Sequence, residues 1–240
     1  MADLSGQVAL VTGASSGIGR AIALRLAAEG ASLCLVGRRP DALESVARNA
    51  GAAARTTTHY ADLSSDQDIR ELALRVGDDF GRIDLLVHSA GVISLGSVES
   101  APVGDLDRQY QINVRAPYLL TQMLLPLLRS HQGQVVFVNS SAAVSARAKV
   151  SQYAATKAAL KALADSLRSE VNADGIRVLS IFPGRTASPM QRAVHEMLDE
   201  SYRPERLLQP EDVAAAVVSA LCMPRSAEVT EINVRPLAKP

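Results

Sequence analysis

Short apolar runs alternate with longer stretches of helical period along the whole chain. The β-branched-rich runs predict strands at residues 7–12, 32–37, 55–60, 83–88, 134–139, 177–182 and 228–234. The stretches between them predict helices at residues 17–29, 40–50, 65–80, 103–130, 151–172 and 210–222. Several strands are apolar without alternation, which indicates burial on both faces. The pattern therefore predicts an α/β fold in which a doubly wound parallel sheet of about seven strands has helices on both faces.

Residues 184–209 interrupt this alternation. The segment is rich in charged residues, Met and Pro, and it follows the sixth predicted strand. A long excursion at the carboxyl end of a parallel strand lies where such folds bind ligands. A solvated surface helix around residues 191–199 explains the composition equally well. No linker or repeat divides the chain, so we expect one domain over residues 1–240 that contains this excursion.

Composition and charge exclude several classes of protein. With 48% apolar residues, the chain can bury enough surface to fold. Its 25 basic and 25 acidic residues cancel, which argues against nucleic acid and anionic lipid as partners. The first residues lack the basic and apolar regions of a signal peptide, and no apolar run approaches the ~20 residues of a membrane span. We expect a soluble cytoplasmic protein.

The cysteines and histidines indicate neither a disulfide framework nor a metal site. Cys34 and Cys222 both lie in apolar runs, and we expect two buried, reduced thiols. The four histidines are scattered along the chain at His59, His88, His131 and His195. No group of residues has the spacing of metal ligands, and no metal is predicted.

The first predicted strand runs directly into a glycine-rich turn that opens a helix. Gly13 permits a tight turn, Gly17 lets the backbone approach a pyrophosphate, and Gly19 lets the helix pack against the strand. The helix N-terminus adds N–H donors and a partial positive charge for the phosphates. Incidental glycines in a plain strand-to-helix turn are the alternative interpretation. Because the turn joins a buried strand to a helix, a dinucleotide site is favoured.

The end of the second strand indicates which dinucleotide is bound. An acidic residue is expected there, about 20 residues further on, where the ribose 2′-hydroxyl of NAD is held. This chain instead has Gly37 followed by Arg38 and Arg39. A guanidinium group matches a 2′-phosphate in charge and geometry, although two exposed arginines can also be merely solvated. Beside the glycine turn, the arginines favour NADP(H) over NAD(H).

Tyr153 and Lys157 form a candidate acid–base pair. They lie four residues apart at the start of a predicted helix and therefore share one face. A phenol with a reference pKa of ~10 carries protons poorly at pH 7, and a cation one turn away is expected to lower that pKa toward neutrality. Taken alone, such pairs are mostly surface residues. Ser140, in the loop after the fifth strand, lies at the same sheet edge and favours the catalytic interpretation.

The chain resembles the short-chain dehydrogenase/reductase family, in the form with a Thr-Gly-x-x-x-Gly-x-Gly turn. The resemblance extends from residue 7 to about residue 234. Its motifs, in family order and spacing, are residues 12–19, Asp62-Leu63, Ala90-Gly91, Asn113, Ser140, Tyr153 with Lys157, and Pro183-Gly184. The resemblance implies a Rossmann-like fold and an oxidoreductase that interconverts a carbonyl compound and an alcohol by hydride transfer.

The resemblance implies a catalytic role for each of four residues. Tyr153 is the expected acid–base, which gives its proton to the carbonyl oxygen, and Ser140 orients that oxygen. Lys157 is expected to bond the nicotinamide ribose hydroxyls and to lower the pKa of the tyrosine. Asn113 is expected to keep a water-linked proton path to the lysine.

The resemblance also implies a set of dinucleotide contacts. Asp62 meets the adenine, Ile18 borders the pyrophosphate, and either Ser188 or Thr186 supplies a hydroxyl for the nicotinamide carboxamide. Together with the residues argued above, the expected contacts are Gly13, Ser15, Ser16, Gly17, Ile18, Gly19, Arg38, Arg39, Asp62, Leu63, Ala90, Gly91, Asn113, Tyr153, Lys157, Pro183, Gly184, Thr186 and Ser188.

The chain departs from the family pattern at two places. The family's Asn-Asn-Ala-Gly stretch reads His88-Ser89-Ala90-Gly91 here, and Ser89 can replace only part of the brace that the second asparagine supplies. His88, at a strand end, is interpreted as a structural histidine rather than a base. The end of the chain lacks the family's common Asp-Gly-Gly, which bears on the mode of assembly.

We expect an NADP(H)-dependent reductase of small carbonyl compounds, or the reverse alcohol dehydrogenase. The alanine-rich stretch 154–167 and the large side chains Leu119, Leu120, Met123 and Leu124 suit helix packing, either within the chain or between subunits. The resemblance implies pairing across a two-fold axis, and hence a homodimer or homotetramer. A non-catalytic dinucleotide sensor or scaffold, and an epimerase-type relative, are the alternatives.

Overall fold

The computed structural model describes residues 3–237, and its central feature is a parallel sheet. The strands are β1 Val8–Thr12, β2 Ser32–Gly37, β3 Thr56–Tyr60, β4 Leu85–His88, β5 Gln134–Val138, β6 Arg177–Pro183 and β7 Glu231–Val234. Their order across the sheet is β3-β2-β1-β4-β5-β6-β7, and every pairing is parallel. The winding reverses between β1 and β4, which creates a ligand crevice at the carboxyl ends of these strands. The predicted fold class is confirmed.

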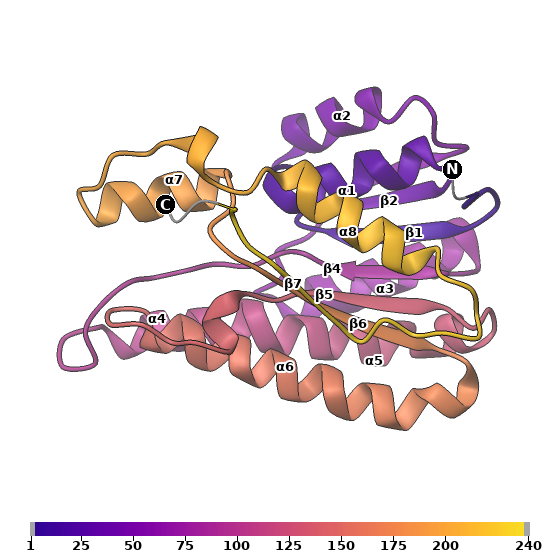
Figure 1. Cartoon of the computed structure of the whole chain (residues 1–240). Coiled ribbons are helices and arrows are strands. Elements are labelled where there is room, and N and C mark those ends of the chain that lie inside the picture. Colours follow the sequence, from indigo (N-terminus) through magenta and orange to yellow (C-terminus); the bar gives the residue numbers. More distant parts are fainter. Residues whose placement is uncertain (1–2, 238–240) are drawn as a thin grey trace.

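Helices cover both faces of the sheet (Figure 1). They are α1 Gly17–Ala28, α2 Pro40–Asn49, α3 Asp66–Phe80, α4 Val103–Tyr110, α5 Ala116–Arg129, α6 Ser151–Val171, α7 Pro189–Met197 and α8 Pro210–Leu221. The first face packs against α1, α2 and α8, and the second against α3, α5 and α6.

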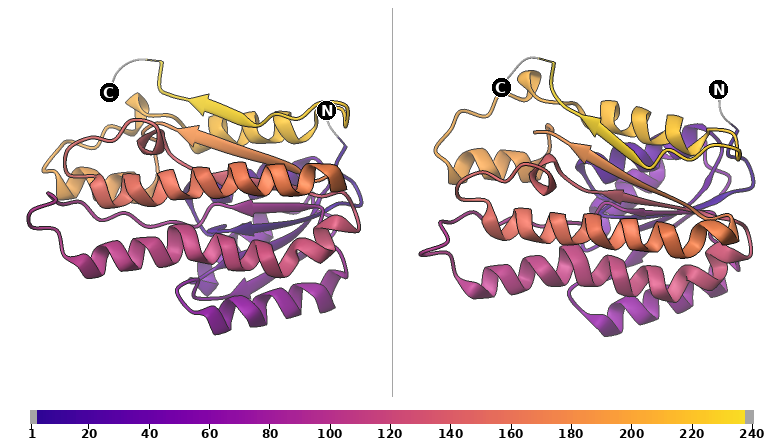
Figure 2. Two further views of the ribbon diagram at one scale, coloured as in Figure 1. Left: turned by 90° about the horizontal axis from the view of Figure 1, so that it is seen from below. Right: turned by 60° about the horizontal axis from the view of Figure 1, so that its bottom comes forward.

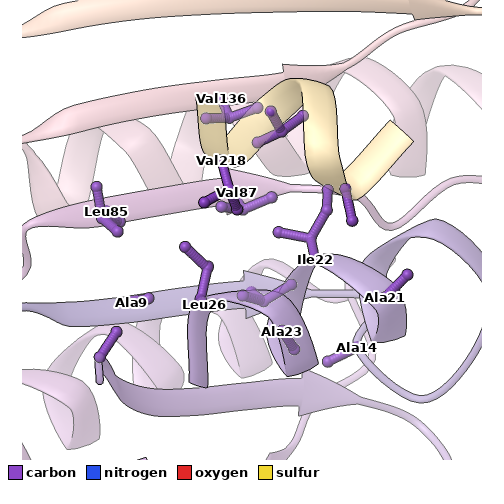
Figure 3. Close-up of a cluster of buried hydrophobic side chains, with 14 of the residues drawn as sticks. Ala9, Ala14, Ala21, Ile22, Ala23, Leu26, Leu85, Val87, Val136 and Val218 are labelled. Carbon is purple, nitrogen blue, oxygen red and sulfur yellow. The ribbon is translucent and has the colours of Figure 1, made fainter. Parts of the chain in front are cut away.

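The central strands contribute alternate side chains to two hydrophobic cores. In β1, Ala9 and Val11 face the core beneath α1 and α8, whereas Val8 and Leu10 face the core beneath α3 and α5. Figure 3 shows the first core, where side chains from α1, α8 and the strands interdigitate. This double burial explains why the strands are apolar at consecutive positions, as the sequence pattern indicated.

The predicted helix at 103–130 is interrupted in the structure. A π-helical turn, Gln111–Arg115, separates α4 from α5 and carries the buried Asn113. Such wide turns occur frequently at functional sites. The hydrophobic period passes through the turn without a break, so the sequence pattern predicted one continuous helix.

The excursion at residues 184–209 contains α7 and a short 3₁₀ turn, Pro204–Arg206. Thr186 and Leu208 pair in a parallel bridge at its base, and the backbone N–H of Ala187 donates to the Leu208 oxygen at 2.8 Å. Figure 2 shows α7 beyond the carboxyl ends of β6 and β7, at the end of the sheet where the crevice lies. Pro189 and Met190 of α7 line the cavity, and other residues of the helix are exposed to solvent. The substrate-binding role of this segment stays a prediction.

One cysteine differs from the expectation. Cys34 is buried in β2, but Cys222 is only partly buried because it ends α8 near the surface. Within residues 3–237, no helix is long and apolar enough to cross a membrane. The same residues contain no cluster of three or more His, Cys, Asp or Glu side chains that could hold a metal.

Candidate active site

A cavity of about 470 Å³ opens at the carboxyl ends of the strands. It extends from the β1–α1 turn and the end of β2 to the start of α6 and the start of α7. The lining residues predicted from the sequence are Gly13, Ser15, Ser16, Gly17, Ile18, Gly19, Arg38, Arg39, Asp62, Leu63, Ala90, Gly91, Tyr153, Lys157 and Ser188. The fold therefore brings together most of the predicted contacts from widely separated parts of the chain.

The glycine turn is shaped by close backbone approaches. A Cβ atom on Gly19 would lie 2.4 Å from the Gly13 carbonyl oxygen, and a Cβ on Gly13 would lie 2.8 Å from the backbone of Ala90. Gly17 has a φ of +54°, which L side chains rarely adopt. No side chain caps the N-terminus of α1, where Ser16 is the N-cap residue. Its first N–H groups and partial positive charge suit a pyrophosphate.

Two exposed arginines border the same end of the cavity. Arg38 and Arg39 follow β2, and the Arg39 Nη2 atom lies 3.4 Å from the Ser15 Oγ. Asp62 lies across from them. Hydrogen bonds from the backbone and side chain of Ser64 hold the pKa of Asp62 below its usual value, and the charge of Arg38 adds to this. The arginines make this rim the cationic part of the cavity.

At the other end, Lys157 is buried beside Tyr153. Lys157 is only 4% exposed, and its Nζ donates to the Val138 carbonyl oxygen at 3.0 Å. The Nζ lies 5.8 Å from the centroid of the Tyr153 ring. Burial lowers the pKa of Lys157 to about 8, because the low-dielectric surroundings disfavour the ammonium form.

The pKa of Tyr153 departs from the prediction. Burial of its hydroxyl raises this pKa above the ordinary value, and a hydrogen bond with the Ser140 side chain lowers it by less. The predicted lowering by Lys157 is therefore wrong for the arrangement of these side chains. The sequence places the cation one turn away but says nothing of desolvation, which is the largest cause of the shift. Ser140 contacts Tyr153 although it does not line the cavity.

Asn113 is completely buried behind the cavity wall. Its Nδ2 donates to the Val92 oxygen at 2.9 Å and to the Thr156 Oγ1 at 3.1 Å, and its Oδ1 accepts from the Val92 N–H at 2.9 Å. A Cβ on Gly91 would lie 3.3 Å from the Asn113 Oδ1 and 3.8 Å from the Lys157 Nζ. The amide oxygen and the ammonium group thus both lie beside Gly91. The water-linked path between them stays a prediction.

Besides Asn113, three predicted contacts do not line the cavity. Pro183 and Gly184 do not line it, and the Thr186 hydroxyl donates to the Gly184 oxygen at 3.0 Å. Ser188 does line it, and its Oγ accepts from the Gln191 N–H at 3.2 Å as the N-cap of α7. Of the two hydroxyls left open by the sequence, that of Ser188 therefore lies at the cavity.

The sequence analysis missed several lining residues. These are Gly37, Ala61, Ser89, Ile112, Val138 and Asn139. Most of them are immediate neighbours of predicted contacts at strand ends, so their place along the chain was a usable signal. Val92, Pro189 and Met190 also line the cavity, and they belong to the segments 92–95 and 186–198 in which the sequence placed the substrate pocket.

His88 has a structural environment. Its Nε2 lies 2.8 Å from the Thr121 Oγ1, and its ring stacks on Phe137 with centroids 5.0 Å apart. Burial lowers the pKa of His88 to about 3. The interpretation of His88 as a satisfied structural histidine is confirmed. Beside it, the N–H groups of Ser89 and Ala90 both donate to the Thr12 Oγ1, at 3.1 and 3.2 Å.

Comparison with known proteins agrees with this geometry. The family model for short chain dehydrogenases matches residues 7–199. An uncharacterized oxidoreductase of Staphylococcus epidermidis is 34% identical over 238 residues, 99% of this chain and all of the relative.

Two solved structures extend the comparison. An alcohol dehydrogenase from the archaeon Thermococcus sibiricus, complexed with 5-hydroxy-NADP, is 26% identical with a TM-score of 0.89 over 98% of each chain. A 3-ketoacyl-(acyl-carrier-protein) reductase from Brucella melitensis, complexed with NADH, is 29% identical with a TM-score of 0.85, over 96% of this chain and 97% of that one. With the family match spanning most of its length, the chain belongs to the short-chain dehydrogenase family of oxidoreductases.

Proposed function

We propose that the protein reduces a small carbonyl compound to an alcohol with NADP(H), or catalyses the reverse reaction. The observation that carries this proposal is the position of Tyr153 and Lys157, with Ser140 beside the tyrosine, at one end of a cavity whose other end has a glycine turn and two arginines. A nicotinamide dinucleotide fits this site, because the N-terminus of α1, which no side chain caps, lines one end of the cavity and Tyr153 and Lys157 line the other. Relatives of known structure bind NADP-type and NADH ligands.

The two ends would hold different parts of the dinucleotide. The N–H groups at the start of α1 bind the pyrophosphate, and Arg38 and Arg39 bind the 2′-phosphate. Asp62 and Leu63 border the adenine, and Lys157 bonds the ribose next to the nicotinamide. When bound, the nicotinamide supplies the hydride for reduction and accepts it in the reverse direction.

The side chains at the end with Tyr153 and Lys157 transfer the proton. Because burial raises the pKa of Tyr153, its hydroxyl stays protonated at neutral pH and donates its proton to the carbonyl oxygen. Ser140, whose side chain lowers the pKa of Tyr153, orients the carbonyl oxygen beside that hydroxyl. Lys157 carries a positive charge below its pKa of about 8 and stabilises the phenolate that remains. Holding the reactants in this way can supply about 7–11 kcal/mol of the barrier.

Assembly into a homodimer or homotetramer is part of the proposal. Ala155, Ala158 and Ala162 lie exposed along α6 at helical spacing, which lets a second helix approach closely. In contrast, Leu119, Leu120 and Leu124 belong to the core of their own chain, so the intrachain explanation holds for them. We also propose that residues 1–240 act as one domain in the cytoplasm.

Initial rates of NADPH and NADH oxidation over aldehydes, ketones, diketones and quinones test the proposal, with Tyr153→Phe as the control. We expect turnover that prefers NADPH and is lost in the variant, while NADPH still binds. Preference for NADH would contradict the role of the arginines. Binding of NADPH without turnover of any compound would favour a dinucleotide sensor.

A further inference from the structure

A buried amide side chain joins three elements beside Tyr153. Gln109, on α4, has no exposed surface. Its Oε1 accepts from the Ser94 N–H at 3.1 Å, and its Nε2 donates to the Gln152 Oε1 at 3.1 Å and to the Asp105 oxygen at 3.2 Å. Both hydrogens and the oxygen of the amide are thus satisfied, as a buried amide requires. Gln152 in turn donates to the Pro102 oxygen at 3.0 Å.

These contacts repeat those of Asn113 one turn earlier along the helix. Asn113 holds Val92 and reaches Thr156 on α6, while Gln109 holds Ser94 and reaches Gln152 on α6. The next alternate residue of the segment is held as well, because the Gly96 N–H donates to the Lys149 oxygen at 2.9 Å. Bonding at every second residue is typical of an extended chain with one edge fixed. Segment 92–96 is therefore tied along one edge.

The position of this segment bears on the catalytic end of the cavity. Val92 lines the cavity, and Gln152 directly precedes Tyr153 on α6. Gln109 itself lies behind the wall and touches no cavity atom. We propose that Gln109, paired with Gln152, is a positioning residue that fixes segment 92–96 against the start of α6, so that a carbonyl substrate is held at the Tyr153 hydroxyl. The part of this inference that concerns the substrate rests on the proposed function.

The first test uses Gln109→Leu, which keeps a side chain of similar size but removes its hydrogen bonds. Gln67→Leu is the matched control, because Gln67 is exposed on α3 and bonds only to Glu71. Hydrogen exchange of the peptide that contains residues 92–96 is measured without substrate. Rates with a carbonyl substrate are normalised to the number of NADPH-binding sites, so that unfolded protein does not contribute.

In Gln109→Leu, we expect exchange at Ser94 to rise and normalised kcat/KM to fall, each about tenfold, because a buried N–H loses its partner. NADPH affinity stays within about twofold, since the dinucleotide contacts are untouched. Gln67→Leu behaves as the wild type. Unchanged exchange across residues 92–96, or unchanged normalised kcat/KM in an enzyme that turns over, overturns the proposal.

A second variant addresses the pairing. Gln152→Leu removes the partner at a half-buried position, where folding is less sensitive to the change. If the two amides act together, the fold decrease in kcat/KM of the double variant is smaller than the product of the fold decreases of the two single variants. A fold decrease in the double variant equal to that product would show that the residues act separately and would overturn the pairing. If the wild type reduces no carbonyl but Gln109→Leu still raises exchange, the proposed function fails while the fixing of segment 92–96 stands.

Discussion

The two ends of the cavity are lined by different kinds of chemical groups. The dinucleotide end consists of glycine backbone and exposed side chains, with Arg38 and Arg39 at the rim. The catalytic end consists of buried side chains, and Lys157 and Asn113 each make hydrogen bonds to backbone atoms. In the proposed function, selectivity for the dinucleotide would therefore depend on surface groups that can change independently. The protonation states of the catalytic groups depend instead on burial, which a single substitution disturbs strongly.

Lys157→Met tests the catalytic end with the largest expected effect. It removes the charge next to Tyr153 and the hydrogen bond to the Val138 oxygen but keeps an unbranched side chain. We expect kcat to fall by roughly 10²–10⁴-fold, the usual contribution of a positioned acid–base system. Lys161→Met, one turn further along α6, loses only ion pairs with Asp165 and Glu231. A similar loss in both variants would remove the distinction between buried and exposed groups.

Gly19→Ala tests whether the dinucleotide end is set by backbone shape. The new methyl group would meet the Gly13 carbonyl oxygen at 2.4 Å, so the turn must shift. We expect the free energy of unfolding to fall by about 1–3 kcal/mol and the NADPH dissociation constant to rise at least about tenfold. Gly77→Ala is the control, because α3 has open space there and the change should stabilise the helix. Titration and thermal unfolding measure both.

Exchanging the surface groups should have a smaller and more selective effect. Arg38→Ala and Arg39→Ala each remove one charge-assisted contact, and we expect each to weaken NADPH binding about tenfold. Such a hydrogen bond contributes roughly 1.5–3 kcal/mol, and solvent screening reduces this at an exposed position. NADH binding changes little, because that ligand has no 2′-phosphate. Arg48→Ala, at an exposed position of α2, provides the comparison. Equal losses for NADPH and NADH would show that the arginines bind a group common to both.

The smallest effect on catalysis and dinucleotide binding at neutral pH is expected from His88→Asn. Because burial lowers the pKa of His88 to about 3, the unfolded chain takes up a proton below pH 6.5 that the folded chain does not. The wild type therefore loses stability as the pH falls from 6.5 toward 3, by up to about 1.4 kcal/mol per pH unit from this group. The variant lacks this loss. Chemical denaturation at pH 7 and pH 5 measures it, with His131→Asn as control; parallel curves for wild type and His88→Asn would contradict the assignment.

The sequence pattern predicted the fold well because the central strands are buried on both faces and the helices that cover the sheet bury apolar residues against it. It predicted the glycine turn because Gly13, Gly17 and Gly19 satisfy local backbone requirements. The π-helical turn at Asn113 and the direction of the Tyr153 pKa shift were missed for a different reason. Both depend on contacts between distant parts of the chain, namely the bonds from Asn113 to Val92 and the burial of the Tyr153 hydroxyl. Periodicity and spacing carry no information on either.

The paired base of the excursion has a consequence for how this fold can diversify. Because Thr186 and Leu208 bridge directly, the chain between them begins and ends at neighbouring points outside the main sheet. Closing a loop of twice the length costs only about 0.6 kcal/mol more. Segment 188–207 can therefore be lengthened, shortened or replaced in evolution or by engineering, while the strands keep their register. The part of the cavity wall that α7 forms can thus be replaced without a change in the sheet.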